Sequence, residues 1–96
     1  LVHTIGRLYW HKGDHAGLAK KMVAHFKEDV RARTYLRTFA YDEPTIAHLA
    51  AKTGRSNEEL ALRLNAIKQR EQAAHLDQNE LLELSTELHE FRQLIR

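Results

Sequence analysis

The stretch that decides the fold runs from Ile46 to Leu60 and reads IAHLAAKTGRSNEEL. Its first part places apolar residues at helical spacing before Gly54, a residue type that commonly follows the last turn of a helix. Ser56 stands three residues before Glu59, which is the capping-box spacing at the start of a second helix. The stretch therefore predicts two helices joined by a short turn, a helix-turn-helix-like hairpin.

The residues on either side extend both helices of this hairpin. Asp42 is a suitable N-cap for the first helix, and Pro44 falls in its first turn, where a backbone N–H would have no helical partner. In the second helix, Leu64 and Ile67 continue the apolar face. The helical pattern fades near residues 73–76. We therefore expect the hairpin to lie within residues 42–76.

Two further helices are predicted before the hairpin. Leu1–His11 carries apolar residues at helical spacing, and Gly13 is expected to end that helix. Asp14 can cap the next helix, whose apolar face continues to about residue 35 or 36. We expect the chain to leave the helical conformation near residues 38–41.

One more helix is predicted at the C-terminal end. Asp77 and Glu80 repeat the capping-box spacing. The apolar residues that follow are spaced alternately three and four apart: Leu81, Leu84, Leu88, Phe91 and Ile95. This heptad seam fits either a core-facing stripe or a coiled-coil dimer. Two heptads are too short to hold a dimer alone, so we favour the core-facing stripe.

Composition agrees with a helical protein. Ala, Leu, Glu, Lys, Arg and Gln are abundant, and four Gly and one Pro argue against a linker. The 96 residues suffice for one small domain, so we predict a single helical domain over residues 1–96. Its fold class is predicted as all-α, a compact bundle of about five helices that includes the hairpin. The predicted core is Ile5, Leu8, Leu18, Met22, Phe26, Val30, Ile46, Leu49, Leu60, Leu64, Ile67, Leu81, Leu84, Leu88 and Phe91.

The ends and the cysteine content bear on the context of the chain. It begins at Leu1 without a methionine, and we interpret it as a fragment of a longer protein. No apolar run approaches the roughly 20 residues that span a bilayer. The absence of cysteine excludes disulfides, thiolate metal sites and cysteine nucleophiles, and it fits a reducing compartment.

Seven histidines raise the question of a metal site. His11 and His15 are four residues apart, but Gly13 and Asp14 lie between them and should interrupt a helix, which removes the usual metal-binding geometry. The other histidines are scattered. No GxSxG, phosphate-binding glycine loop or HExxH motif is present. We therefore predict no catalytic residue, cofactor or metal ligand, and we do not expect an enzyme.

Charge is distributed unevenly along the chain. Residues 1–41 hold eight Lys and Arg against three Asp and Glu, whereas residues 42–96 hold seven against ten. Basic and acidic helices that pack side by side with solvated faces would account for this. The sharper interpretation places the basic half near an anionic surface, either a membrane or a nucleic acid.

The hairpin also raises the possibility of DNA binding. The first exposed positions of its second helix would contact bases or phosphates, which makes Arg55, Asn57 and Arg63 the candidate nucleic-acid contacts. Glu58 and Glu59 stand among them, and a phosphate backbone would repel both carboxylates. Glu59 can also form an i,i+4 ion pair with Arg63. A hairpin used for packing is therefore favoured over a DNA-binding motif.

Aromatic residues gather at predicted helix ends in the basic half: Tyr9, Trp10, Tyr35, Phe39 and Tyr41. Most should belong to the core or cover it. The others would form an exposed patch that binds a partner. The sequence does not separate these two interpretations.

Three stretches resemble a known family. They are IGRLYWHKGDHAGLAKKM, VRARTYLRTFAYDEPTIAHLAAKTGRSNEEL and ELLELSTELHEF, and the most specific parts are GRLY at residues 6–9, Asp14–His15 and LAAKTG at residues 49–54. Together they resemble the C-terminal segment of an uncharacterised bacterial membrane-protein family, the domain of unknown function 4350 of Bacteroidetes-type bacteria. The resemblance covers nearly the whole chain.

The resemblance implies a cytoplasmic segment that follows a transmembrane helix, and it supplies no functional residue. A basic half just after a membrane segment would fit the positive-inside rule and anionic lipid head groups. We therefore predict a non-catalytic cytoplasmic protein-interaction module of a membrane-anchored bacterial protein. Its protein partner is unknown, and its place is the cytoplasmic side of the inner membrane. The alternative is a nucleic-acid-binding helix-turn-helix domain.

Overall fold

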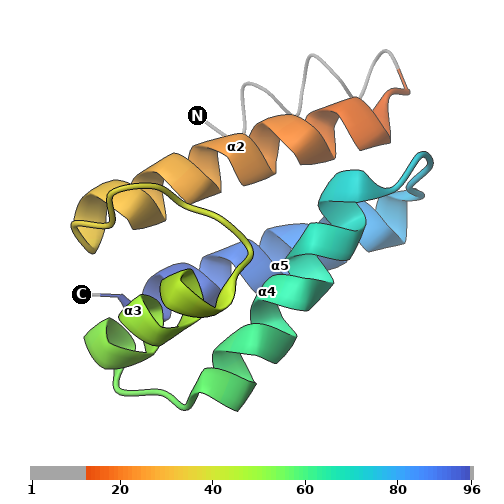
Figure 1. The fold of residues 1–96 in the computed structure, drawn as a ribbon. Coiled ribbons are helices and arrows are strands. Elements are labelled where there is room, and N and C mark those ends of the chain that lie inside the picture. The colour runs from red at the N-terminus through yellow and green to blue at the C-terminus, as the bar shows by residue number, and fades with distance from the viewer. Residues whose placement is uncertain (1–12, 96) are drawn as a thin grey trace.

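The computed structural model describes residues 13–95, and these residues form four α-helices and no strand. The helices are α2 (His15–Arg33), α3 (Glu43–Thr53), α4 (Asn57–Gln72) and α5 (Gln78–Leu94) (Figure 1). The all-α prediction is confirmed, but the described part has four helices where the prediction was about five. The helix predicted over Leu1–His11, together with Ile5, Leu8, Tyr9 and Trp10, lies outside the described residues.

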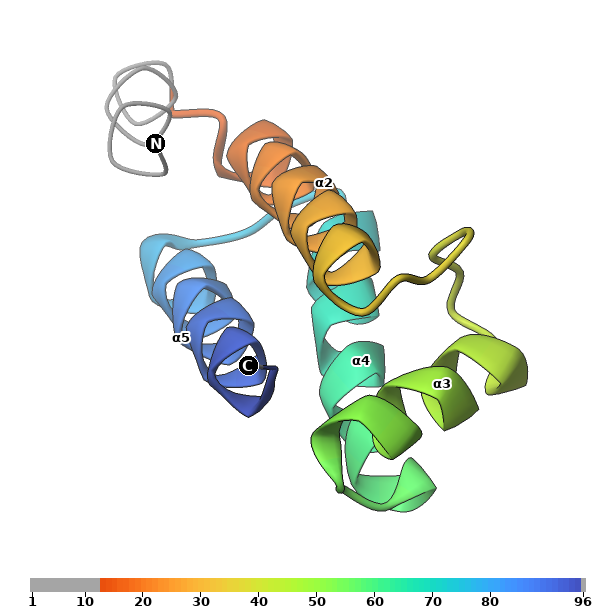
Figure 2. The same cartoon turned by 90° about the vertical axis from the view of Figure 1, so that its left-hand side faces the viewer.

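Three of the described helices form a bundle, and the fourth packs against one of them. Helices α2, α4 and α5 all contact one another, and α3 packs against α4. Figure 2 shows α3 beside the N-terminal end of α4 and away from α5. A connection of three residues, 54–56, joins α3 to α4. The α2–α3 connection, residues 34–42, therefore runs along the outer side of the molecule.

Four side chains begin the four helices. Asp14, Asp42, Ser56 and Asp77 each accept a hydrogen bond from the backbone N–H three residues later, at 2.8–3.1 Å. These bonds satisfy N–H groups that have no partner within the helix. All four residues were predicted as caps from the sequence.

One predicted capping box is incomplete. The side chain of Glu80 accepts from the Asp77 N–H, so the box that begins α5 is complete. At the start of α4, only the Ser56 half forms. The Glu59 carboxylate pairs instead with Arg63, at 3.0 Å, and with Arg55, at 3.6 Å. The two guanidinium groups attract the carboxylate away from the backbone N–H of the cap, because each carries a full positive charge.

One core gathers the apolar faces of all four helices. The whole predicted α5 seam is buried, which confirms the core-facing interpretation of the heptad pattern. Phe26 lies at the centre, with its ring in edge contact with Phe91 at a centroid distance of 5.3 Å. Ile46 was predicted to be buried but is only partly so, because it lies on the rim where α3 leaves the bundle. Ala19 and Leu76 join the core without having been predicted.

No helix within residues 13–95 combines the length and the apolar character that a bilayer crossing requires.

Candidate functional site

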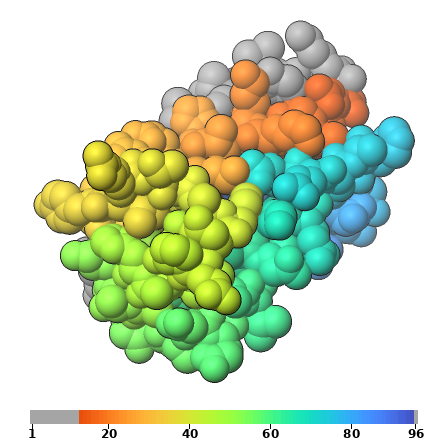
Figure 3. Space-filling view, in the orientation of Figure 1, coloured from red at the N-terminus to blue at the C-terminus, as the bar shows by residue number. Residues whose placement is uncertain are grey.

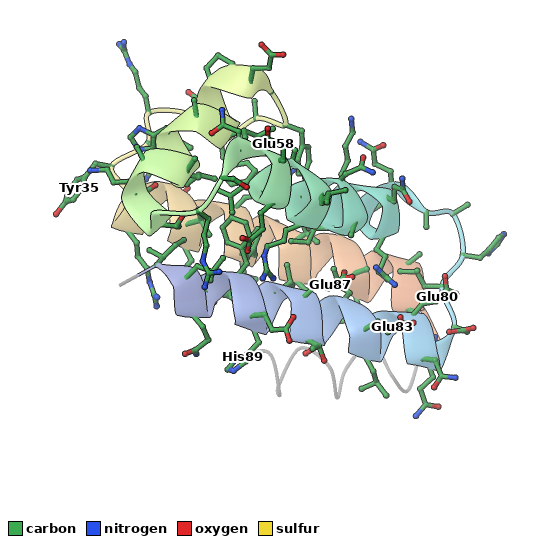
Figure 4. All side chains as sticks on the ribbon, turned by 90° about the horizontal axis from the view of Figure 1, so that it is seen from below. Tyr35, Glu58, Glu80, Glu83, Glu87 and His89 are labelled. Carbon is green, nitrogen blue, oxygen red and sulfur yellow. The ribbon has the colours of Figure 1, made fainter. Side chains whose placement is uncertain are left out.

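The aromatic residues of the α2–α3 connection divide into two kinds. Phe39 packs edge-on against Phe26, with centroids 6.3 Å apart, and Tyr41 packs against Phe39. Both rings therefore cover the core, as one of the two interpretations predicted. Tyr35 is 85% exposed, the most exposed large hydrophobic residue in the described part of the chain. Figure 4 shows its side chain pointing away from the bundle.

Tyr35 is exposed because of the way in which α2 ends. The helix ends at Arg33, two or three residues before the predicted end at residue 35 or 36. The Leu36 N–H donates to the Arg31 carbonyl at 2.9 Å, and the Tyr35 N–H donates to the Ala32 carbonyl at 3.4 Å. These two bonds form a Schellman motif, which needs a left-handed residue at the position of Tyr35.

The backbone at Tyr35 has a φ of +58°, and Tyr35 is the only non-glycine residue with a positive φ within residues 13–95. Glycine usually occupies this position because a Cβ there costs roughly 1–2 kcal/mol. Burial of the ring does not offset this cost. The fold therefore uses the backbone of Tyr35 to end α2 but leaves its side chain exposed.

Three other side chains lie near Tyr35 in the fold. Lys52 of α3 places its ammonium group 5.8 Å from the centroid of the tyrosine ring. His48 forms a hydrogen bond through Nε2 to the Thr34 carbonyl at 2.7 Å, which ties α3 to the end of α2. Arg37 is exposed and has no ion-pair partner in the described part. We call Tyr35, Arg37, His48 and Lys52 the α2–α3 corner.

The corner borders a shallow depression of about 500 Å³. Figure 3 shows the segment that follows α2, in yellow, at the edge of the molecule beside α3. The depression is lined by Tyr35, Leu36, Arg37, Thr38, Asp42, Pro44, Thr45 and His48.

The segment at the end of α2 is basic. The sequence 31–37 contains three arginines and no acidic residue. Arg31 pairs with Glu28 at 2.8 Å, and this hydrogen bond lowers the pKa of the Glu28 carboxyl. Arg33 pairs with Asp29 at 3.0 Å. Within residues 13–95, the cations of Arg37 and Lys52 have no carboxylate partner.

Tyr41 belongs to a structural cluster instead. Its hydroxyl donates to Glu71 Oε1 at 2.8 Å, and Lys27 pairs with Glu71 Oε2 at 2.8 Å. The pKa of the Tyr41 hydroxyl is raised far above its usual value. Burial is the larger cause, and the hydrogen bond to the Glu71 carboxylate is the second. The cluster fastens the α2–α3 connection to α4, which positions the corner.

The structure brings together two of the three candidate nucleic-acid contacts. Arg55 and Arg63 both pair with Glu59, and Arg63 also approaches Glu90 at 4.0 Å. Asn57 is exposed at the first position of α4. The two arginines are thus held by a carboxylate, and Glu58 is exposed in the first turn of α4 (Figure 4).

No group of three or more His, Cys, Asp or Glu side chains that could hold a metal occurs within residues 13–95. His11 lies outside this range, so the pair that it would form with His15 is not described.

The sequence model of one family, the DUF4350 C-terminal helical domain, matches residues 2–95. No curated protein and no solved structure matches the chain.

Proposed function

The chain belongs to the DUF4350 C-terminal helical domain family, and we propose that it is a non-catalytic protein-interaction module whose contact surface is the α2–α3 corner. The observation that carries this proposal is the combination of strain and exposure at Tyr35. A residue that costs backbone energy and buries nothing in the isolated chain is explained if a partner buries it.

The residue types at the corner fit a protein interface. Tyr and Arg are enriched among the residues that carry most of the energy of protein–protein binding. A rigid tyrosine ring supplies a large contact area at a low entropic cost. Lys52 lies 5.8 Å from the centroid of the ring, and Arg37 lines the same depression as Tyr35, so the matching surface of the partner should combine an apolar recess with carboxylates.

Site-specific photo-cross-linking tests the proposal. The photoreactive residue p-benzoylphenylalanine is placed at position 35 of the full-length protein in its native cells. The control position is Leu62, which is 74% exposed on α4. We expect a discrete protein adduct from position 35 and not from position 62. Adducts of equal yield from both positions, or none from position 35, would overturn the proposal.

Placement on the cytoplasmic side of a membrane-anchored protein is a further part of the proposal. It is supported by the basic residues of α2, among which Lys21 is exposed and unpaired within residues 13–95. Sedimentation with vesicles that contain anionic lipid tests contact with the surface. We expect Lys20→Glu with Lys21→Glu to reduce binding, and neutral vesicles to bind neither protein. Equal binding of the double variant would remove the membrane contact.

The nucleic-acid alternative is less well supported, because Glu59 holds both Arg55 and Arg63. Titration with duplex DNA at low and moderate salt distinguishes the two functions. Binding that falls steeply with salt and is lost in Arg55→Ala or Arg63→Ala would favour the helix-turn-helix domain. The absence of binding at low salt would end that alternative.

A further inference from the structure

A second depression lies on the outer side of α5. It measures about 530 Å³ and is lined by Asn79, Leu82, Glu83, Thr86 and Glu87. Leu82 is 56% exposed although it is apolar, and it lies between polar neighbours. We call this surface the α5 groove.

The α5 groove is acidic. Glu83 and Glu87 approach the same guanidinium, that of Arg70, at 3.4 and 2.8 Å. One arginine cannot neutralise two carboxylates, and the Glu83 side chain remains 61% exposed. Over residues 77–94, the chain carries five acidic residues against one arginine.

The corner and the groove are complementary. The corner presents the exposed Tyr35 ring, with the Lys52 ammonium 5.8 Å from its centroid and Arg37 two residues along the chain, and neither cation has a carboxylate partner within residues 13–95. The groove presents an exposed leucine flanked by carboxylates. Figure 4 shows Tyr35 at one end of the molecule and Glu80 and Glu83 towards the other. The two surfaces therefore cannot meet within one chain.

We propose that the α2–α3 corner of one copy docks into the α5 groove of a second copy, with the Tyr35 ring against Leu82. This inference rests on the proposed function, because it names the partner of the same corner. The contact joins two different surfaces, so the copy that gives its corner keeps a free groove and the copy that gives its groove keeps a free corner. Association therefore proceeds head to tail.

The contact is small, which sets its strength. One side chain and its neighbours in a shallow groove bury less than the roughly 1,000 Å² of a stable interface. Association should therefore be weak, with a dissociation constant on the order of 0.1–1 mM for the isolated domain. It should weaken further as the salt concentration rises, because the charges are exposed.

Two variants each remove one half of the proposed interface, the corner in one variant and the groove in the other. Tyr35→Asn removes the ring from the corner and leaves the groove intact. Asparagine tolerates a positive φ, so the backbone at the end of α2 should keep its conformation. Leu82→Lys places a cation in the groove and leaves the corner intact. Both positions are exposed, so both variants should fold, and circular dichroism checks this. Neither variant alone should self-associate, but a mixture of them should form a 1:1 pair.

The experiment is an NMR titration of ¹⁵N-labelled Tyr35→Asn with unlabelled Leu82→Lys. We expect concentration-dependent shifts of the amides of Asn79, Leu82, Glu83 and Thr86. The matched control titrant carries both substitutions and should cause no shifts. The inference is overturned if no shifts appear at about 1 mM protein, or if the control titrant causes equal shifts.

Failure here is distinguishable from failure of the proposed function. If position 35 cross-links to a different protein and the variants do not pair, the second copy is ruled out as the partner, and the interaction role of the corner stands. If position 35 gives no adduct and the variants do not pair, both proposals fail.

Discussion

The ammonium group of Lys52 lies 5.8 Å from the centre of the Tyr35 ring, and the two residues belong to different elements. Tyr35 occupies the left-handed position that ends α2, and Lys52 lies in the last turn of α3. A cation–π contact at an exposed site is worth about 0.5–1 kcal/mol. This is less than the strain at Tyr35, so the pair does not explain why a tyrosine is present.

The first prediction concerns Tyr35 itself. Asparagine adopts a positive φ more readily than tyrosine, so Tyr35→Asn should leave the free energy of unfolding unchanged or raise it by up to about 1 kcal/mol. Urea unfolding of the purified domain measures this. A loss of more than about 1 kcal/mol would mean that the ring stabilises the isolated fold, which would remove the reason to assign it to a partner.

Gly54 provides the comparison for a position where the left-handed backbone is purely structural. Its φ is +74°, and an added Cβ would meet no atom within 4 Å. Gly54→Ala should therefore cost about 1–2 kcal/mol through backbone strain alone. Gly54→Asn should cost less. Equal stability of Gly54→Ala and the parent chain in urea would contradict this account of the α3–α4 connection.

Phe26 should be the most sensitive position in the core. Its fully buried ring contacts Phe91 and Phe39 and joins α2 to α5 and to the α2–α3 connection. Phe26→Ala should lower the free energy of unfolding by about 3–5 kcal/mol, enough to unfold much of a small domain. Leu62→Ala, at an exposed position, should change it by less than about 0.5 kcal/mol. Similar losses at both positions would argue against this core.

Tyr41 should make stability depend on alkaline pH. Its pKa is raised in the folded state, so the folded chain keeps a proton that the unfolded chain loses near pH 10. The stabilisation is complete below about pH 10 and is lost as the pH rises further. Tyr41→Phe should cost about 1–2 kcal/mol at neutral pH by removing the bond to Glu71, and it should remove this part of the alkaline loss.

Urea midpoints between pH 8 and 11 test this expectation. The control is Tyr35→Phe, which alters an exposed hydroxyl and should keep the pH profile of the parent chain. If Tyr41→Phe and the parent chain lost stability in parallel above pH 10, the role assigned to the Tyr41 hydroxyl would be wrong.

Helix starts and buried faces were predictable because both depend on local chemistry. Asp42 and Ser56 can cap whatever the rest of the fold does, and the spacing of Leu81 to Phe91 selects one face of α5. The second half of the α4 capping box did not form, because Glu59 pairs with Arg63, the i,i+4 partner that the sequence also predicted, and with Arg55. Two arginines compete for Glu59, and their reach depends on side-chain geometry.

The corner was only partly predictable. Tyr35 was among the grouped aromatics, but its exposure depends on where α2 ends, and no glycine or proline follows Arg33 to mark that end. The Schellman bonds from Leu36 and Tyr35 fix the end by backbone geometry. Lys52 and Tyr35 are brought together by the packing of α3, which no sequence spacing reveals.

The most direct test of the interaction role is a comparison of stability and affinity in one variant. The protein that cross-links at position 35 is purified, and its dissociation constant is measured by calorimetry for the parent chain and for Tyr35→Asn. We predict that Tyr35→Asn keeps or raises its unfolding midpoint and binds at least about tenfold more weakly, as expected for an aromatic residue at the centre of an interface. Equal affinity with unchanged stability would contradict the assignment of the corner as the contact surface.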